Sequence, residues 1–468
     1  MRSAPAKRES GSAIIRSFAY KSFSIMTLGV ERLKRFAAAL VAILCTSLIL
    51  ISCGGYGSNS TSGQTSNPKF RAFVSQDIAT AILSPGLIII DAQKDQRAAA
   101  APVGGAGGFE PAMMVISNDH KLTVSVSSSA TSLQVVDNAK QTQTGVVTLP
   151  GTTESVLISG DNATGYAAVP TAPVPGGGSA GGIAIANLTQ GGAPNILPIP
   201  GAHYLAQSGD GSKLLAFSDN SDSVTIVSPF NIIAGQKDAT CATDVCTTVS
   251  GFDRPVAGFF SSDNTQAWIL NCGSECGGVQ ASVQLLDLVH ATAGPPTVLP
   301  GGATVGLIKG QTLYVAGNPP AGANSCSGGP TTTATTCGRL TVVELGSLPQ
   351  ATPIAPTAVI PDGYHTKIDI SGDGQLFVGS RTCTNIVPVN AGDEQRGCLA
   401  IFNTNNGNLI IPPDNGDVTG MQPITNRTVF YVVEGGELRI YDTTTDKLST
   451  LKSIDIFGHA VDVKLIDF

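Results

Sequence analysis

The chain has 468 residues, of which 42% are hydrophobic, 13% charged and 5% aromatic, with 54 Gly, 28 Pro and a single Trp. This density of turn-forming residues excludes a mainly helical protein, and the hydrophobic content excludes a chain that is disordered throughout. The formal net charge is −7. We therefore expect an all-β protein that buries a sizeable core.

The N-terminal segment has the order of a secretory signal. Three basic residues, Arg32, Lys34 and Arg35, precede an unbroken apolar run over residues 36–51. A transmembrane anchor is the alternative, but the run is shorter than the ~20 residues that a spanning helix needs. Met26, a few residues upstream, is a candidate for the true start of the protein.

The apolar run ends in Leu50-Ile51-Ser52-Cys53, which resembles the lipobox of bacterial lipoproteins. The resemblance implies that residues 1–52 are a signal peptide and that Cys53 becomes the lipid-modified N-terminus. Residues 53–69 then form a lipidated, flexible tether rich in Ser, Thr, Gly and Asn. Gly54 in place of Asp implies sorting to the outer membrane, on a side that the sequence does not indicate. We expect the protein to attach to the membrane through this lipid.

Cleavage before Cys53 would change the charge of the protein. Without residues 1–53 the chain has 19 Lys and Arg against 32 Asp and Glu, a net charge of −13. Such a chain is repelled by phosphate backbones. The composition therefore excludes nucleic acid as a partner.

Eight further cysteines fall into local couples. An even number of cysteines in an exported protein indicates disulfides, although eight cysteines allow 105 pairings and only the spacing suggests which pairs form. A zinc site at Cys272 and Cys276 is the alternative, disfavoured because no Cys-x-x-Cys and no nearby His accompany them. We expect no metal and no cofactor. The couples are Cys241 with Cys246, Cys272 with Cys276, Cys326 with Cys337, and Cys383 with Cys398.

A short apolar strand that ends in an acidic or small polar residue recurs eight times, at spacings of 39 to 59 residues. A second apolar run precedes each copy. Before most of these runs lies a first strand that ends in a tight turn of the form Ser-x-Asp followed by Gly, Asn or His. Asp-Gly and Asp-Asn tolerate the positive φ of tight hairpins, so each unit reads as an antiparallel meander of three or four strands. The eight strand ends are Asp91, Asp137, Asn187, Ser228, Asp287, Glu344, Asn403 and Asp442.

Four-stranded units of this length are typical of the blades of a β-propeller, because a lone meander leaves both faces exposed whereas a ring buries them. We predict an eight-bladed propeller over residues 70–468, with seven blades as the alternative. The final strand, from His459, matches the first strand of a unit, whereas the first unit begins with its second strand at Phe70. The C-terminal strand is therefore expected to close the ring.

The repeat of apolar strand, Ser-x-Asp-Gly, apolar strand and Thr-rich turn, as in residues 442–447, resembles the YVTN-type and lactonase-like propellers. That resemblance implies blade geometry and no particular chemistry. Quinoprotein-type propellers depend on a Trp in most blades, whereas Trp268 stands alone here. No Cys-x-x-Cys-His motif for covalent haem is present.

The longest insertions are expected in loops that join second to third strands, which would place them on one face of the ring. Insertions on one face of a repeat protein often mark its binding face. Neutral loops stapled by disulfides are the alternative, and an envelope protein is the partner that we expect this face to engage. The insertions lie at 170–182, 272–278, 317–338 and 381–397.

Few residues suggest catalysis. His203, His365 and His459 each fall just before a first strand and are candidates for the channel mouth, where a shared metal is conceivable but unsupported by acids at a constant offset. The strand-end acids recur too evenly for a catalytic set, which needs an asymmetric constellation. Residues 177–181 match G-x-S-x-G but lack the helix of a nucleophile elbow.

We therefore predict a non-catalytic lipoprotein of the cell envelope, a propeller that acts as a binding or scaffold module. The alternatives are a channel-mouth hydrolase or lactonase-like enzyme, and a sugar-binding surface protein that the low aromatic content disfavours. The sequence names no small ligand.

Overall fold

The structure is a computed structural model that describes residues 68–77, 86–104, 111–174, 178–232, 241–320, 326, 336–384, 386–388, 394–412 and 416–467. The chain divides into two units, residues 1–63 and 64–468, and all described residues belong to the second. The predicted signal segment, Cys53 and the tether up to residue 67 lie outside the described residues. Within the described part, no helix has the length and apolarity required to cross a membrane.

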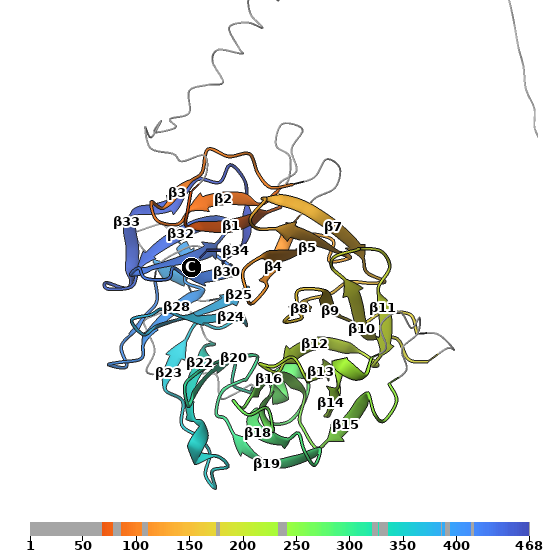
Figure 1. Ribbon diagram of the computed structural model, residues 1–468. Helices are drawn as coiled ribbons and strands as arrows, with labels where there is room; N and C mark the ends of the chain where they lie inside the picture. Colours follow the sequence, from red (N-terminus) through yellow and green to blue (C-terminus); the bar gives the residue numbers. More distant parts are fainter. Residues whose placement is uncertain are drawn as a thin grey trace, which may run out of the picture. The chain divides into compact units, whose positions relative to one another are not determined.

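The second unit is all-β, and its described residues form eight four-stranded antiparallel sheets that follow one another around a ring (Figure 1). This confirms the eight-bladed propeller over the seven-bladed alternative. Helical structure in the described ranges is limited to three short 3-10 turns, at Pro229–Asn231, Gly273–Cys276 and Leu345–Ser347. We number the blades 1 to 8 from the N-terminus and their strands first to fourth from the inside outwards.

The strands of blades 1 to 4, from first to fourth, have the following bounds. Blade 1 is β34 (Ala460–Leu465), β1 (Arg71–Gln76), β2 (Ile88–Asp91) and β3 (Gln96–Arg97); blade 2 is β4 (Pro111–Ile116), β5 (Leu122–Ser127), β6 (Ser132–Asp137) and β7 (Thr142–Thr148); blade 3 is β8 (Ser155–Ile158), β9 (Thr164–Val169), β10 (Gly182–Asn187) and β11 (Asn195–Pro198); blade 4 is β12 (Ala202–Gln207), β13 (Leu214–Ser218), β14 (Ser223–Val227) and β15 (Cys246–Ser250).

Blades 5 to 8 repeat the arrangement, and blade 7 carries an extra hairpin between its second and third strands. Blade 5 is β16 (Pro255–Phe260), β17 (Gln266–Asn271), β18 (Ser282–Asp287) and β19 (Thr292–Val298); blade 6 is β20 (Val305–Lys309), β21 (Thr312–Gly317), β22 (Gly338–Glu344) and β23 (Ala358–Ile360); blade 7 is β24 (Tyr364–Ile370), β25 (Gln375–Arg381), β28 (Leu399–Asn403) and β29 (Leu409–Ile410), with the hairpin β26 (Ile386–Pro388) and β27 (Glu394–Arg396); blade 8 is β30 (Val418–Pro423), β31 (Val429–Glu434), β32 (Glu437–Asp442) and β33 (Lys447–Ile454).

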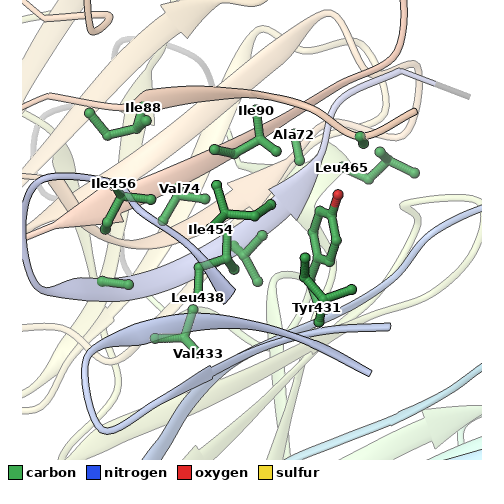
Figure 2. Packing of buried hydrophobic residues seen from close by; sticks show 14 of the residues in the cluster. Ala72, Val74, Ile88, Ile90, Tyr431, Val433, Leu438, Ile454, Ile456 and Leu465 are labelled. Carbon is green, nitrogen blue, oxygen red and sulfur yellow. The ribbon is translucent and has the colours of Figure 1, made fainter. Parts of the chain in front are cut away.

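The middle strands are apolar on both faces because each blade is covered by a neighbour on either side. In β1, Ala72 and Val74 pack toward blade 8 (Figure 2), whereas Phe73 between them packs toward blade 2. Alternate side chains of a strand point to opposite faces, so a continuous apolar run supplies two interfaces at once. Eight buried clusters result, one between each pair of consecutive blades.

The Ser-x-Asp turns join first to second strands, as the sequence predicts. In blade 4 the Ser208 hydroxyl donates to the Asp210 carboxylate at 2.7 Å and accepts the Lys213 N–H at 2.9 Å. The residue after the Asp has a positive φ of 71° at Gly211, where a side chain is disfavoured, and the same left-handed position is occupied by His120, Asn162, Asn264 and Gly374 in blades 2, 3, 5 and 7.

Most of the recurring Asp and Asn residues at the ends of third strands close the turn between the third and fourth strands. Asp137 Oδ1 accepts the N–H groups of Ala139 and Lys140 at 3.0 and 2.9 Å, and Asn187, Asp287 and Asn403 accept the equivalent pairs. These side chains stabilise tight turns by replacing a backbone acceptor. Their recurrence therefore has a structural explanation.

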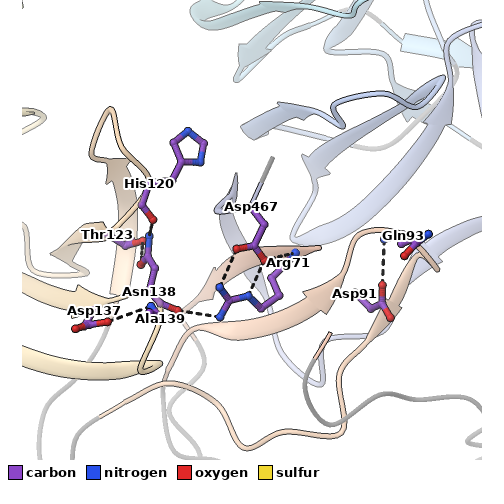
Figure 3. Close-up of polar contacts among 9 residues, drawn as sticks. All are labelled: Arg71, Asp91, Gln93, His120, Thr123, Asp137, Asn138, Ala139 and Asp467. Carbon is purple, nitrogen blue, oxygen red and sulfur yellow. Dashed lines mark hydrogen bonds and ion pairs between the residues drawn. The ribbon is translucent and has the colours of Figure 1, made fainter. Parts of the chain in front are cut away.

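The ring is closed by the last strand, since β34 pairs with β1. Arg71 at the start of β1 holds the end of the chain through two parallel contacts with Asp467, 2.6 Å from Nε and 2.8 Å from Nη2 (Figure 3). Its Nη1 also donates to the Asn138 carbonyl of blade 2 at 2.8 Å. One guanidinium thus joins the C-terminus, β1 and the neighbouring blade.

Replacing Asp467 by Asn should lower the free energy of unfolding by about 1–2 kcal/mol, because it removes one partner of a largely buried, bidentate ion pair. Urea unfolding monitored by circular dichroism measures the change. The exposed pair of Lys140 with Asp137 is the control, since Lys140→Ala should have a much smaller effect. Equal effects of the two substitutions would contradict the role of Asp467 in closure.

Candidate functional site

The ring encloses a cavity of about 600 Å³ at one end of its central channel. Residues from all eight blades line it, from the beginnings of the first strands and from loops between second and third strands. They include Met113, Glu154, Tyr204, Val256, Thr304, Lys367, Thr419 and Val461. The cavity therefore lies on the face for which the sequence predicts the insertions.

Bulges near the beginnings of the first strands direct side chains into the cavity. In six blades the pairing of the first strand with the second slips within its first few residues. In blades 1, 5, 7 and 8 the extra residue is Val461, Val256, Thr366 and Thr419, and each lines the cavity. A bulge re-aims a side chain in this way at the expense of a local bend in the strand.

All four predicted disulfides are present, with the pairing that the spacing suggests. Three of them belong to loops between second and third strands and so decorate the cavity end, where Cys276 itself lines the cavity. Cys241–Cys246 lies between the third and fourth strands of blade 4, at the other end. Much of the insertions at 317–338 and 381–397 falls outside the described residues.

Polar contacts tie the decorated loops of blades 5, 6 and 7 together. Glu275, inside the Cys272–Cys276 loop, accepts the N–H and the side-chain amide of Asn318 at 2.8 and 2.9 Å, and the same amide donates to the Gly363 carbonyl at 2.7 Å. Burial raises the pKa of Glu275 to about 7, so this buried link is partly protonated near neutral pH. The rim of the cavity is thus cross-linked between blades.

A second link runs through Asp362, just before β24. Its carboxylate accepts the Thr336 hydroxyl and, at 2.6 Å, the Thr384 N–H. Thr336 adjoins Cys337 and Thr384 adjoins Cys383, so two disulfide loops share one carboxylate.

His203 lies beside the cavity between two carboxylates. Its Nδ1 is 2.6 Å from Asp219 Oδ1, its Nε2 is 3.5 Å from Glu154 Oε2, and its ring stacks on Tyr204. Glu154 and Asp219 raise the pKa of His203 against the opposing effect of burial, and the contact with His203 lowers the pKa of Glu154. His203 lines a smaller, adjoining cavity of about 130 Å³.

The other two candidate histidines have different surroundings. His365 is buried; its Nε2 donates to the Pro361 carbonyl at 2.9 Å, and burial lowers its pKa to about 4, so the ring is neutral. It contributes to the wall of the main cavity. His459 is half-exposed, pairs with Asp77 at 3.1 Å and lines neither cavity. The three rings therefore do not share one site.

Two tyrosines give the mouth an aromatic wall. Tyr204 and Tyr364 both line the main and the smaller cavity. Burial is the main cause that raises the pKa of Tyr204, and the neighbouring Tyr364 is the next, so the Tyr204 hydroxyl stays protonated. An aromatic face beside polar groups is a common feature of small-molecule sites.

The cations Lys367 and Arg381 line the same cavity, as does the buried carboxylate of Asp462. Asp462 is already engaged, because its two oxygens accept the N–H groups of Met114 and Val463 at 2.9 Å each. In the described ranges, no three His, Cys, Asp or Glu side chains form a group that could hold a metal ion. Ser179 of the G-x-S-x-G string is exposed in the loop between β9 and β10.

Sequence reasoning missed Lys367, Arg381, Glu154 and both tyrosines. The signal that was present is compositional, since aromatic residues are only 5% of the chain and yet Tyr204 and Tyr364 each adjoin a histidine at the start of a first strand. The bulges leave no mark in the pattern of apolar residues. The cavity lining therefore depends on register that only the structure supplies.

The coupling between His203 and Glu154 should depend on pH. Because the pKa of His203 is raised in the folded state, the charged pair stabilises the fold fully below about pH 6.5, and this stabilisation is lost as pH rises through the folded pKa of His203. In acid the stabilisation is lost when Glu154 protonates, which occurs at a pH below the ordinary range of a glutamate because its pKa is lowered. A double-mutant cycle of His203→Gln and Glu154→Gln should give a larger coupling in melting temperature at pH 6 than at pH 9. Coupling that is equal at both pH values would refute the pair.

Comparisons with known proteins agree on the fold and go no further. No family model and no curated protein matches the sequence. Among solved structures, the dihydro-haem d1 dehydrogenase NirN is 10% identical over 87% of this chain and 78% of its own, with a TM-score of 0.53. A putative 6-phosphogluconolactonase from Bacteroides fragilis is 16% identical over 87% of this chain and 100% of its own, with a TM-score of 0.47. The periplasmic gluconolactonase PpgL of Pseudomonas aeruginosa is 12% identical over 85% of this chain and 98% of its own, with a TM-score of 0.46. At these identities the likeness shows a β-propeller fold alone.

Proposed function

We propose that the chain is an exported, lipid-anchored protein of the cell envelope that binds a small molecule, without converting it, in the cavity at the channel mouth. The observation that carries the proposal is the cavity itself, which has about 600 Å³ and is lined by residues of every blade. Ligand sites of proteins are concave and of about 300–1,000 Å³, with a few convergent polar groups. This cavity has that size and that mixture of aromatic, aliphatic and charged walls.

The cross-linked rim supports binding. Glu275, Asn318 and Asp362 join loops of three blades, and disulfides at Cys272–Cys276 and Cys383–Cys398 restrain two of those loops. A site that is ordered before the ligand arrives loses less conformational entropy on binding.

Export is supported by the four disulfides, which persist in oxidising compartments. The lipobox-like Cys53 and the polar tether that follows support anchoring, with Gly54 favouring the outer membrane. Several acyl chains on one cysteine would hold the protein stably, whereas a single chain binds membranes only marginally.

Hydrolysis at the same mouth is the second candidate, favoured by the 2.6 Å contact between His203 and Asp219, which resembles the orientation of a general base. The raised pKa of His203 argues against it, because a base must be neutral at the working pH. Its Nε2 also faces Glu154 at 3.5 Å. We therefore favour binding over catalysis.

Filling the cavity should abolish binding and leave the fold intact. Val256 lines both cavities, so Val256→Trp should remove the rise in melting temperature that a ligand from a library of small acids, phosphates, sugars and amino acids gives to the unmodified chain. Val146→Trp, on the outer strand β7 where Val146 is 47% exposed, is the matched control and should retain the shift. A shift that survives in Val256→Trp, or a library without any ligand, would count against the proposed site.

Anchoring has a separate test. Cys53→Ala should move the protein from the membrane fraction to the soluble fraction and abolish labelling by a radioactive fatty acid, because the thiol is the only expected site of lipid attachment. Cys45→Ala, in the apolar run, is the control and should change neither result. Retention of Cys53→Ala in the membrane would favour the transmembrane alternative instead.

A further inference from the structure

The side of the cavity formed by blades 7 and 8 carries two cations that lack protein partners. Lys367 lies on β24 and Arg381 at the end of β25, and both line the cavity. Neither side chain hydrogen-bonds to, or forms an ion pair with, any residue in the part of the chain that the structure describes. Arg381 is exposed, whereas Lys367 is partly buried, and a partly buried charge is normally paired.

Three charged side chains act on Lys367. Asp462 attracts the Lys367 ammonium, whereas Lys464 and Arg381 repel it. Asp462 is a weak counter-ion, since its oxygens already accept two backbone N–H groups and lie 3.9 Å from the Lys464 ammonium. Burial is the largest cause that lowers the pKa of Lys367; Asp462 opposes it, and Lys464 and Arg381 lower the pKa further. The other carboxylate of the cavity, Glu154, lies 3.5 Å from His203, and the more distant Arg381 attracts it and helps to lower its pKa.

Two hydroxyls in the same wall also lack partners. Thr366 and Thr419 occupy the bulge positions of blades 7 and 8. Both residues line the cavity, and their Oγ1 atoms are buried with no hydrogen-bond partner among the described residues. Buried polar groups without partners destabilise a protein, so each calls for an explanation, and a ligand that supplies the partner is one.

We propose that this wall binds an oxyanion of the ligand, a carboxylate or a phosphate, between the Lys367 ammonium and the Arg381 guanidinium. The hydroxyls of Thr366 and Thr419 are the further donors. The planar guanidinium suits two parallel hydrogen bonds to an oxyanion, and the ammonium adds a point charge. The body of the ligand then lies toward Tyr364. This inference rests on the proposed function and adds the chemical class of the ligand.

Calorimetric titration of the full chain with inorganic phosphate and with succinate tests the proposal and distinguishes the two anions. We expect saturable binding of at least one of them, weakened roughly tenfold or more in Lys367→Met and in Arg381→Gln, because each removes a charge-assisted contact. The matched control is Lys309→Gln, an exposed cation beside the turn between β20 and β21 at the opposite end of the ring, which should change the affinity less than about twofold.

The melting temperature supplies a readout that a structural lysine would not reproduce. Without anion, Lys367→Met should melt at the temperature of the unmodified chain or above it, because the substitution removes an unpaired, partly buried charge. Added anion should raise the melting temperature of the unmodified chain and leave that of Lys367→Met unchanged. A large loss of stability in Lys367→Met without anion would show that the lysine is structural and would overturn the proposal.

Two further outcomes would overturn the proposal. One is the absence of saturable binding of both anions, and the other is binding that Lys367→Met and Arg381→Gln leave unchanged. If a neutral compound from the library still binds and is lost in Val256→Trp, the oxyanion site fails while the proposed binding function stands. If no compound binds, both fail together.

Discussion

The structure depends on the burial of both faces of every blade. Alternate residues of a middle strand pack toward opposite neighbours, as Phe73 does on one side of β1 and Val74 on the other. A blade at an open end would expose one of these apolar faces to water and an unpaired edge beside it. Closure of the ring is therefore required by the same alternation that builds each sheet, and β34 provides it by pairing with β1.

Closure also assembles the candidate site. The first strands lie around the channel (Figure 1), so groups from blades that are far apart in the sequence meet at its mouth, as Lys367 of blade 7 and Asp462 of blade 1 do. The sheets act as a rigid frame, whereas bulges and loops between second and third strands supply the polar side chains. Repeat proteins commonly combine a frame of structurally similar units with loops that differ from one unit to the next.

Strand order, turns, blade number, closure and disulfide pairing could all be predicted, because they depend on patterns that are local in the sequence or repeat from blade to blade. Ser208-Gly209-Asp210-Gly211 specifies its hairpin through contacts within six residues. The site could not be predicted in the same way. That Thr366 and Lys367 both line the cavity depends on a one-residue slip between β24 and β25, and the burial of His365 depends on the packing of Pro361 and Gly338 around it.

Calorimetric unfolding of a chain that ends at Gly458 tests the central claim most directly, since it removes β34 and nothing else of the described sheets. The account predicts loss of the wild-type transition, because blade 1 loses its first strand and the clusters on either side of it are opened. It also predicts that the channel-mouth cavity, which Val461 and Asp462 help to line, is lost. A truncated chain that unfolds in one transition at the wild-type temperature would contradict closure of the ring as the constraint on which the fold and the site depend.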